Sequence, residues 1–135
     1  MIDSYKRSRK IWESLNNTDR LLVSPRGNYV DSDKILYRKV LTVNNEDVGF
    51  VDIYKHMPFS NSGFVLIAVK DNHRGKGYAE TLLKDAINDS KELNIKKLIY
   101  RCEKTNLPSI ELAKKCGFTP TKVVSINYCE FCYNL

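Results

Sequence analysis

The residues from Gly63 to Leu83 have the sequence GFVLIAVKDNHRGKGYAETLL, and the rest of the chain is organised around them. The stretch begins with an uninterrupted apolar run, Phe64 to Val69, which is typical of a strand buried on both faces in the centre of a sheet. A polar turn with two glycines follows, and apolar residues between Leu82 and Ile87 then recur with the spacing of one helix face. The pattern predicts a strand, a glycine turn and a helix, in that order.

The two glycines of the turn, Gly75 and Gly77, indicate an anionic ligand. Glycine lets backbone amides approach a ligand closely, and the unpaired N–H groups and dipole of a helix start favour a phosphate there. Two common phosphate-binding motifs do not fit. The chain has no G-x-x-x-x-G-K-[ST], and its G-x-G lacks the third glycine and the downstream acidic residue of a dinucleotide-binding fold.

Two motifs follow one another in the C-terminal half of the chain. The first is Arg74-x-x-Gly77-x-Ala79, and the second is NLPSIELAKKCGF, from Asn106 to Phe118. The first resembles the acetyl-CoA signature R/Q-x-x-G-x-G/A of the GCN5-related N-acetyltransferases (GNAT family), and the second resembles the later family segment N-x-x-[AS]-I-x-L-Y-x-K-x-G-F. Glycine turns are common, so the two motifs together carry the resemblance. One position departs from the family, because Ala113 stands where a Tyr is usual.

The resemblance implies a fold, a reaction and a cosubstrate. The expected fold is of the α/β class with a mixed sheet (α+β character), a central twisted sheet flanked by helices, and residues 1–135 would form a single N-acetyltransferase domain. The expected reaction moves the acetyl group of acetyl-CoA to a primary amine of an acceptor that the sequence does not identify. Ala113 leaves a second hypothesis open, a catalytically weak or inactive CoA-binding module that acts as a sensor or scaffold.

The resemblance also assigns roles along the cofactor. Backbone groups of residues 67–69 are expected to hydrogen-bond the pantetheine arm, and the Val69 N–H to steady a developing oxyanion. Amides of residues 74–79 would bind the pyrophosphate, with Arg74 and Lys76 adding charge. The residues expected to bind the cofactor are Ile67, Ala68, Val69, Arg74, Gly75, Lys76, Gly77, Tyr78, Ala79, Asn106, Ser109 and Lys115.

The catalytic acid and base are not assigned by the sequence. Ala113 lacks the phenol that would protonate the departing thiolate, and general acid help is typically worth ~10²–10⁴ in rate. Asp52, His56 and Tyr128 are candidates to deprotonate the amine, and the sequence does not choose among them. Asp52 shares a strand face with apolar residues, so it is either buried with a raised pKa or exposed on an edge strand.

Composition and charge bound the class of protein. Apolar residues make up 42% and charged residues 28%, as in soluble globular proteins. No apolar run approaches the ~18 residues of a membrane span, and the N-terminus MIDSYKRSRK lacks the apolar core of a signal peptide, so we expect a cytoplasmic protein without a membrane partner. The net charge of +6 favours acidic partners. With the two motifs it favours a phosphorylated cofactor over nucleic acid, beside a small-molecule or peptide amine as acceptor, and it leaves a homodimer open.

The four cysteines do not indicate a metal site. They are Cys102, Cys116, Cys129 and Cys132. Cys129 and Cys132 lie three apart in a strand-like run, where they would face opposite ways, and a second close pair with zinc-finger spacing is missing. We expect reduced, packed thiols and no metal.

The N-terminal half is expected to hold a helix and a hairpin. An amphipathic helix should run from Ser4 to Leu15, with Asp3 or Ser4 as N-cap. Residues 16–33 are rich in turn formers and should be irregular, and the resemblance implies that they form part of the acceptor wall. Two strands, 36–43 and 48–54, should form an antiparallel hairpin closed by residues 44–47.

The C-terminal half completes the pattern. The helix after Gly77 should end near Leu93 and Asn94, with Asn94 as a left-handed cap, and residues 97–102 should form a strand parallel to the first. A helix should follow, capped by Thr105 or Asn106 and closed by Gly117. Residues 122–133 should form one long strand or a hairpin at the sheet edge.

Overall fold

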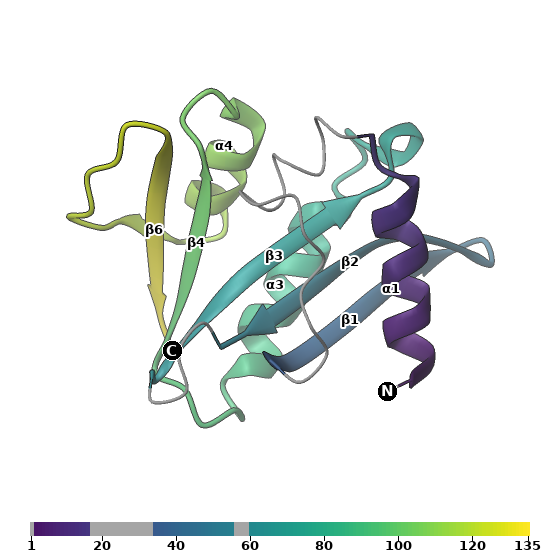
Figure 1. Cartoon of the computed structure of the whole chain (residues 1–135), viewed down its shortest axis with the longest axis horizontal. Coiled ribbons are helices and arrows are strands. Elements are labelled where there is room, and N and C mark those ends of the chain that lie inside the picture. Colours follow the sequence, from purple (N-terminus) through teal and green to yellow (C-terminus); the bar gives the residue numbers. More distant parts are fainter. Residues whose placement is uncertain (1, 17–33, 56–59) are drawn as a thin grey trace.

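The computed structural model describes residues 2–16, 34–55 and 60–135, which form a six-stranded sheet flanked by helices (Figure 1). The strands are β1 (Ile35–Val43), β2 (Glu46–Tyr54), β3 (Ser62–Val69), β4 (Lys97–Glu103), β5 (Thr119–Pro120) and β6 (Tyr128–Asn134). The helices are α1 (Ile2–Ser14), α3 (Tyr78–Ser90) and α4 (Leu107–Lys115), with a short 3-10 helix η2 (Asp71–His73). The strand order is β1-β2-β3-β4-β6-β5, with β3 and β4 parallel and the other pairs antiparallel. The expected mixed sheet is confirmed.

The hairpin of β1 and β2 has a tighter turn than expected. Asn44 and Asn45 have φ of 50° and 64°, the two positive values of a type I′ turn, whose twist matches that of the flanking strands. Asparagine tolerates this left-handed conformation, so two residues reverse the chain. Glu46 and Asp47, which were expected in the turn, instead pair with the last two residues of β1.

The decisive feature of the sheet is the separation of β3 from β4. The two strands pair only from Ser62 with Lys97 to Phe64 with Ile99. Beyond that point they diverge, β3 toward η2 and β4 toward α4 (Figure 1). Since β2 stays paired with β3 as far as Val69, the divergence leaves one edge of β3 open.

The open edge of β3 presents backbone N–H groups. Lys70 N–H donates to the Val48 carbonyl on β2 at 2.8 Å. Backbone groups of successive strand residues point to alternate edges, so the N–H groups of Val69 and Ile67 point away from β2. The separation therefore leaves these donors of β3 without a strand partner among the described residues.

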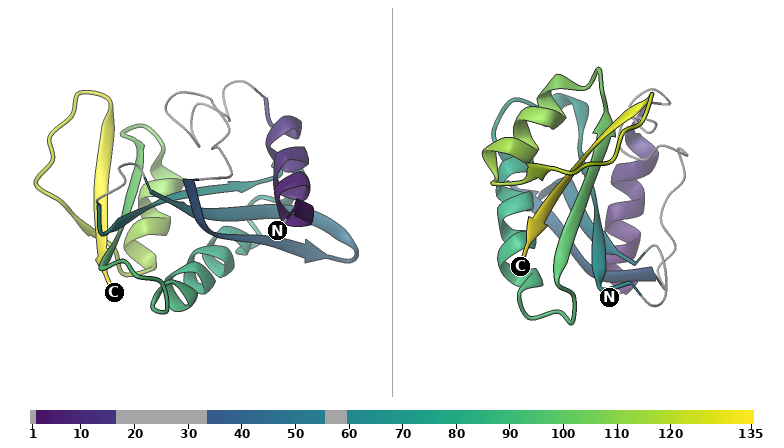
Figure 2. Two further views of the ribbon diagram at one scale, coloured as in Figure 1. Left: turned by 60° about the horizontal axis from the view of Figure 1, so that its bottom comes forward. Right: turned by 90° about the vertical axis from the view of Figure 1, so that its left-hand side faces the viewer.

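Helices lie on both faces of the sheet, α1 on one face and α3 with α4 on the other (Figure 2), and a hydrophobic cluster lies under each. We call the two faces the α1 face and the α3 face. On the α1 face, the helix residues Ile11, Trp12 and Leu15 pack against Phe50, Leu66 and Ala68. On the α3 face, α3 and α4 cover a larger cluster that includes Val51, Ile53, Leu82, Leu83, Leu98, Tyr100, Ala113, Phe118 and Phe131. The apolar faces predicted for the first helix and for the helix after Gly77 are thus buried, in α1 and α3.

Two helix ends differ from the expectation. α1 begins at Ile2, so Asp3 and Ser4 lie within its first turn and neither is the N-cap. α3 ends at Ser90, and Asn94 is not among the described residues with positive φ. The chain leaves α3 through a tightened turn, in which Leu93 N–H donates to the Ser90 carbonyl at 3.0 Å, so no left-handed residue is needed.

The structure shows neither form expected for residues 122–133. They contribute to one strand, β6, which lies between β4 and β5, and its hairpin partner β5 precedes that range. β5 pairs with β6 through Thr119 and Pro120 only, and residues 121–127 connect the two strands outside the sheet. Pro120 has no N–H to donate, which limits pairing at this edge. Val124 and Ile126 in the connection are 94% and 91% exposed.

Cys129 and Cys132 lie on opposite faces of β6, as their spacing predicted. Cys129 lies opposite Cys102 and Cys132 opposite Ile99, so Cys129 and Cys132 face opposite sides of the sheet. All four cysteines are free thiols. Within the described ranges, no group of three His, Cys, Asp or Glu side chains is arranged to hold a metal ion, and no helix has the length and apolar character of a membrane span.

Candidate active site

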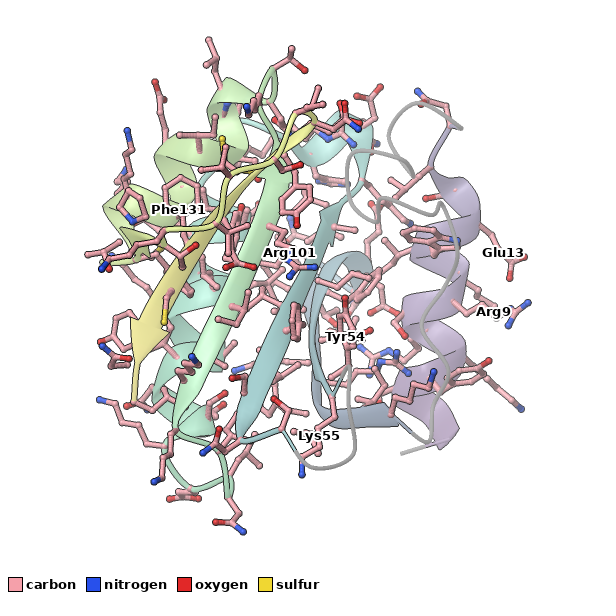
Figure 3. All side chains as sticks on the ribbon, turned by 60° about the vertical axis from the view of Figure 1, so that its left-hand side comes forward. Arg9, Glu13, Tyr54, Lys55, Arg101 and Phe131 are labelled. Atoms are coloured by element: carbon pink, nitrogen blue, oxygen red, sulfur yellow. The ribbon has the colours of Figure 1, made fainter. Side chains whose placement is uncertain are left out.

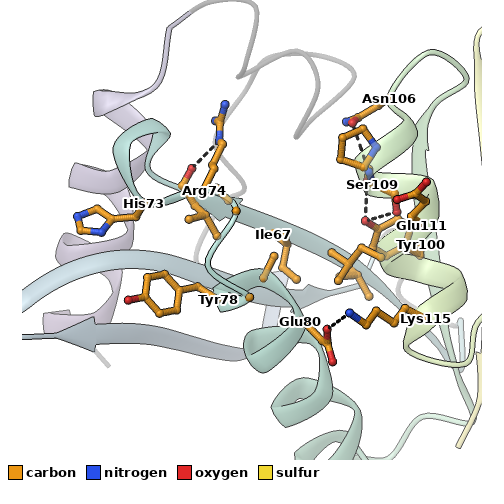
Figure 4. Close-up of a pocket in the computed structure, with 18 of the residues that line it drawn as sticks. Ile67, His73, Arg74, Tyr78, Glu80, Tyr100, Asn106, Ser109, Glu111 and Lys115 are labelled. Carbon is orange, nitrogen blue, oxygen red and sulfur yellow. Dashed lines mark hydrogen bonds and ion pairs between the residues drawn. The ribbon is translucent and has the colours of Figure 1, made fainter.

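A cleft of about 570 Å³ opens on the α3 face where β3 and β4 separate (Figure 4). We call it the β3–β4 cleft. Its walls come from β3, from the glycine turn and the start of α3, from β4 and from α4. The lining residues are Val65, Ile67, Ala68, Val69, His73, Arg74, Gly75, Gly77, Tyr78, Ala79, Glu80, Tyr100, Arg101, Asn106, Pro108, Ser109, Glu111, Leu112 and Lys115.

The residues predicted to bind the cofactor gather at this cleft. All of them line it except Lys76, whose side chain is exposed outside it. Sequence reasoning missed Glu80, Leu112, Tyr100 and Arg101 among others. Helical spacing could have indicated Glu80 and Leu112, whereas Tyr100 and Arg101 line the cleft only because β4 leaves β3.

The glycine turn forms an open cradle beside the end of β3. Gly75 and Gly77 have φ of 76° and 82°, and a Cβ added at either position would meet no atom of the described residues within 4 Å. Gly77 is the N-cap of α3 and no side chain caps that helix, so the first-turn N–H groups keep their capacity for an anion. Arg74 Nε donates to the Val69 carbonyl at 3.3 Å and Nη1 contacts Asp71 at 3.2 Å. These contacts hold the turn against β3.

The α4 wall is built as the sequence predicted. Asn106 caps the helix, its Oδ1 accepting from Ser109 N–H at 3.4 Å, Pro108 lies in the first turn, and Gly117 has φ of 93° beyond the last turn. The Tyr100 hydroxyl reaches this wall from β4 and donates to the Ser109 carbonyl at 3.1 Å. Burial raises the pKa of the Tyr100 phenol, so the phenol stays protonated.

An ion pair joins the two helices across the cleft (Figure 4). Glu80 in the first turn of α3 contacts Lys115 Nζ in the last turn of α4 at 2.9 Å, and Lys84 at 2.7 Å. The hydrogen bond from Lys84 and then that from Lys115 lower the pKa of Glu80 to about 2. Lys115, predicted to contact the cofactor, therefore has a carboxylate partner at the cleft.

Asp52 is completely buried on the α1 face. Both carboxylate oxygens accept from Arg38, at 2.7 Å each, and β2 is an interior strand. Burial raises the pKa of Asp52 and Arg38 opposes that shift, while the bidentate contact requires the ionised carboxylate. Of the two alternatives from the sequence, burial is confirmed and the edge position is wrong. Asp52 does not line the cleft, and its role as base stays a prediction.

The other catalytic positions lie in different surroundings. His56 and residues 17–33 are outside the described residues. Tyr128 begins β6, with its ring centroid 5.1 Å from the guanidinium carbon of Arg101. Ala113 is 0% exposed in the core and is not among the lining residues, so the position at which the family usually has a Tyr contributes to packing here.

Comparison with known proteins identifies the family. The model of the acetyltransferase (GNAT) family matches residues 8–118. Among solved structures, the GNAT domain of S. lividans PAT aligns with a TM-score of 0.79 at 16% identity, over 100% of this chain and 87% of that chain. A ribosomal-protein-alanine N-acetyltransferase from Brucella melitensis aligns with a TM-score of 0.66 at 24% identity, over 73% of this chain and 68% of that chain.

A third structure contains the expected cosubstrate. The yncA protein from Salmonella typhimurium, solved with acetyl-CoA, aligns with a TM-score of 0.61 at 20% identity, over 67% of this chain and 60% of that chain. No curated protein matches the chain by sequence. The structural likenesses agree in fold, and the family match covers more than half of the chain. The chain therefore belongs to the GNAT acetyltransferase family and is an N-acetyltransferase that uses acetyl-CoA as its acetyl donor.

Proposed function

We propose that the β3–β4 cleft binds acetyl-CoA and that the acetyl group passes there to a primary amine. One observation carries this proposal: the open edge of β3 leads, through the short helix η2, to the glycine turn at the start of α3. The N–H groups of Ile67 and Val69 suit the amides of an extended arm, which would pair with β3 as an added strand. A pyrophosphate at the end of that arm would meet the uncapped N–H groups of α3.

The residues of the cleft fit such a ligand. The space above Gly75 and Gly77 would be filled by any side chain, which suits close approach of a phosphate. Val65 and Ile67 provide an apolar floor, and Asn106 and Ser109 provide polar groups on the opposite wall.

The protein's own groups can assist the transfer, in which acetyl-CoA supplies the thioester. In this proposal the Val69 N–H donates to the thioester oxygen, where charge develops. Tyr100 is the proton donor to the departing sulfur, because it brings a protonated phenol to the α4 wall where Ala113 brings none. A thiolate with a pKa near ~8.5 is a tolerable leaving group, so modest help suffices.

Thermal unfolding with and without acetyl-CoA tests the binding site. A ligand that binds only the folded state stabilises it by about 2.7 kcal/mol at a hundredfold excess over its Kd. Gly77→Asn should lose most of this stabilisation, because Asn tolerates the positive φ while its side chain occupies the phosphate space. Gly77→Val should also lose it, with additional backbone strain.

A matched control and a second readout complete the test. Lys91→Asn, beyond the other end of α3, should keep the full acetyl-CoA shift. If Gly77→Asn folds and binds acetyl-CoA as the parent does, the phosphate cradle is misassigned. Thiol release with a panel of amines then tests transfer, and binding without release would favour the sensor or scaffold hypothesis.

A further inference from the structure

A second hollow, of about 310 Å³, lies on the α1 face of the region where β3 and β4 separate. We call it the Arg101 pocket. Its walls include Ser62, Phe64, Lys97, Arg101, Val123 and Glu130. Ser62 and Phe64 share one face of β3 with Leu66 and Ala68, which pack against α1, so the pocket lies on that side of the sheet. Arg101 lines both this pocket and the β3–β4 cleft, and Figure 3 shows it between β3 and β4.

The Arg101 side chain is held in one orientation. Its Nε donates to Glu130 at 2.8 Å. Its guanidinium carbon lies 4.9 Å from the ring centroid of Phe64 on β3 and 5.1 Å from that of Tyr128 on β6. Glu130 is itself 7% exposed and its second oxygen accepts from the Thr121 hydroxyl at 2.8 Å. The guanidinium is thus preorganised by strands on both sides.

The two terminal nitrogens of Arg101 are available for a ligand. Among residues 2–16, 34–55 and 60–135, neither Nη has a hydrogen-bond partner, and the side chain is 36% exposed. The paired Nη groups form a planar fork that matches a carboxylate bidentately. Lys97 and Arg101 against Glu130 leave one net positive charge in the lining, which suits a singly charged anion.

We propose that the Arg101 pocket holds the carboxylate of the acceptor, so that the acceptor is a small amino acid. The inference rests on the function proposed above. Because Arg101 lines both hollows, a carboxylate bound by its Nη groups would lie next to both, and in this proposal the adjacent amine points toward the β3–β4 cleft. The amine nitrogen bonds to the acetyl carbon, the C–S bond breaks with its electron pair on sulfur, and the amine proton ends on the released thiol. The pocket volume is at the lower end of the ~300–1,000 Å³ of small-molecule sites.

The test compares amino acids with their amides as acceptors. Thiol release from acetyl-CoA is measured with the whole chain for the twenty standard amino acids, each beside its carboxamide. Removing a carboxylate lowers the pKa of the neighbouring amine and raises its free-base fraction, so the amide would react faster if no residue bound the carboxylate. We expect the best amino acid to exceed its amide at least about tenfold in kcat/KM. Equal values, or a faster amide, would overturn the proposal.

Variants of Arg101 test whether this residue causes the preference for amino acids over their amides. Arg101→Gln with Glu130→Gln removes the fork without leaving a buried carboxylate unpaired, and Arg101→Lys keeps the charge but not the fork. Both should raise the KM of the amino acid by about 10- to 100-fold, with a smaller change in kcat and an unchanged acetyl-CoA thermal shift. Lys104→Gln, which removes an exposed charge near the end of β4, should behave as the parent. An unchanged KM in the double variant would contradict the assignment.

The remaining outcomes are distinguishable. If acetyl-CoA does not stabilise the parent, the function proposed above fails and the carboxylate site fails with it. If acetyl-CoA binds and amines without a carboxylate are acetylated equally well, only the carboxylate site fails. If acetyl-CoA binds and neither series is acetylated, an amino acid acceptor is excluded. If the double variant is no longer stabilised by acetyl-CoA in thermal unfolding, Arg101 would instead belong to the acetyl-CoA site.

Discussion

The two hollows on either side of the β3–β4 separation are built from different materials. The β3–β4 cleft presents backbone: an open strand edge, two glycines with positive φ and an uncapped helix start. The Arg101 pocket presents side chains, with a guanidinium fixed by a carboxylate and two aromatic rings. A backbone site suits a ligand shared by many proteins, and a side-chain site suits a ligand particular to one.

The difference explains how each hollow can change. A backbone site depends on a few conformations that only glycine or asparagine adopts easily, so its sequence pattern is narrow. A side-chain site can be altered by single substitutions without changing the fold. Binding of the acetyl donor and choice of the acceptor should therefore respond to different mutations, and the changes below probe that division.

The largest expected effect is on stability, and it tests whether the buried Arg38–Asp52 pair on the α1 face stabilises the fold or takes part in catalysis. Asp52→Asn removes the negative charge from the buried bidentate pair with Arg38, and we expect the free energy of unfolding to fall by about 3–5 kcal/mol in urea titrations. Arg38→Met with Asp52→Leu should recover most of that stability and keep acetyl transfer. If instead Asp52→Asn is stable and inactive, Asp52 is the catalytic base and side-chain chemistry extends to β2.

A smaller effect, on kcat, is expected when the Tyr100 phenol at the α4 wall is removed. Tyr100→Phe should lower kcat by about 10- to 100-fold, at the lower end of general acid catalysis because the thiolate leaves readily. Tyr133→Phe is the matched control, since it removes a phenol that packs against the same cluster but does not line the β3–β4 cleft. The pH dependence of kcat should change in Tyr100→Phe only. Equal losses in both variants would indicate a structural role.

How far these features follow from the sequence depends on whether they are local. Gly77, Ala79 and Asn106 were predicted because the turn and the cap depend on nearby residues. Tyr100 and Arg101 were missed because their surroundings depend on where strand pairing stops, which no pattern within β4 indicates.

One further feature has the same origin in contacts between distant segments, and another is local. Arg38 and Asp52 pair because the register of β1 on β2 places them opposite each other. The alternation of hydrophobic residues in the sequence does not predict which polar residues face each other across two strands. The end of α3 was misplaced because Asn94 matched a capping pattern, whereas the helix ends in a tightened turn one residue beyond Ser90.

The substitution Ala113→Tyr tests whether the Tyr that is usual in the family could act at this position. Ala113 is buried in the same core cluster as Tyr100 and Phe118, whose ring centroids lie 5.6 Å apart. Ala113→Tyr should overpack this region and cost about 1–3 kcal/mol of stability, without raising kcat. Urea unfolding and steady-state rates measure both quantities. A higher kcat at parental stability would mean that position 113 can reach the cleft.

The smallest effect concerns the ion pair across the cleft. The pKa of Glu80 is lowered to about 2 from its ordinary 4.5, so its contribution to stability is present above pH 4.5 and is lost as the pH falls toward 2. Glu80→Gln should therefore flatten the fall in melting temperature between pH 4.5 and 2, more at low salt than at high salt. Lys115→Met should keep the part due to Lys84. An unchanged acid profile would mean that the pair does not form in solution.

The most direct test of the division between the two hollows is calorimetric titration of acetyl-CoA into three proteins: the parent, Gly77→Asn, and Arg101→Gln combined with Glu130→Gln. We predict that Gly77→Asn raises the Kd at least about tenfold, or about 1.4 kcal/mol, and that the double variant changes it by less than about twofold. A double variant that loses acetyl-CoA as strongly as Gly77→Asn would contradict the division, because Arg101 would then belong to the donor site.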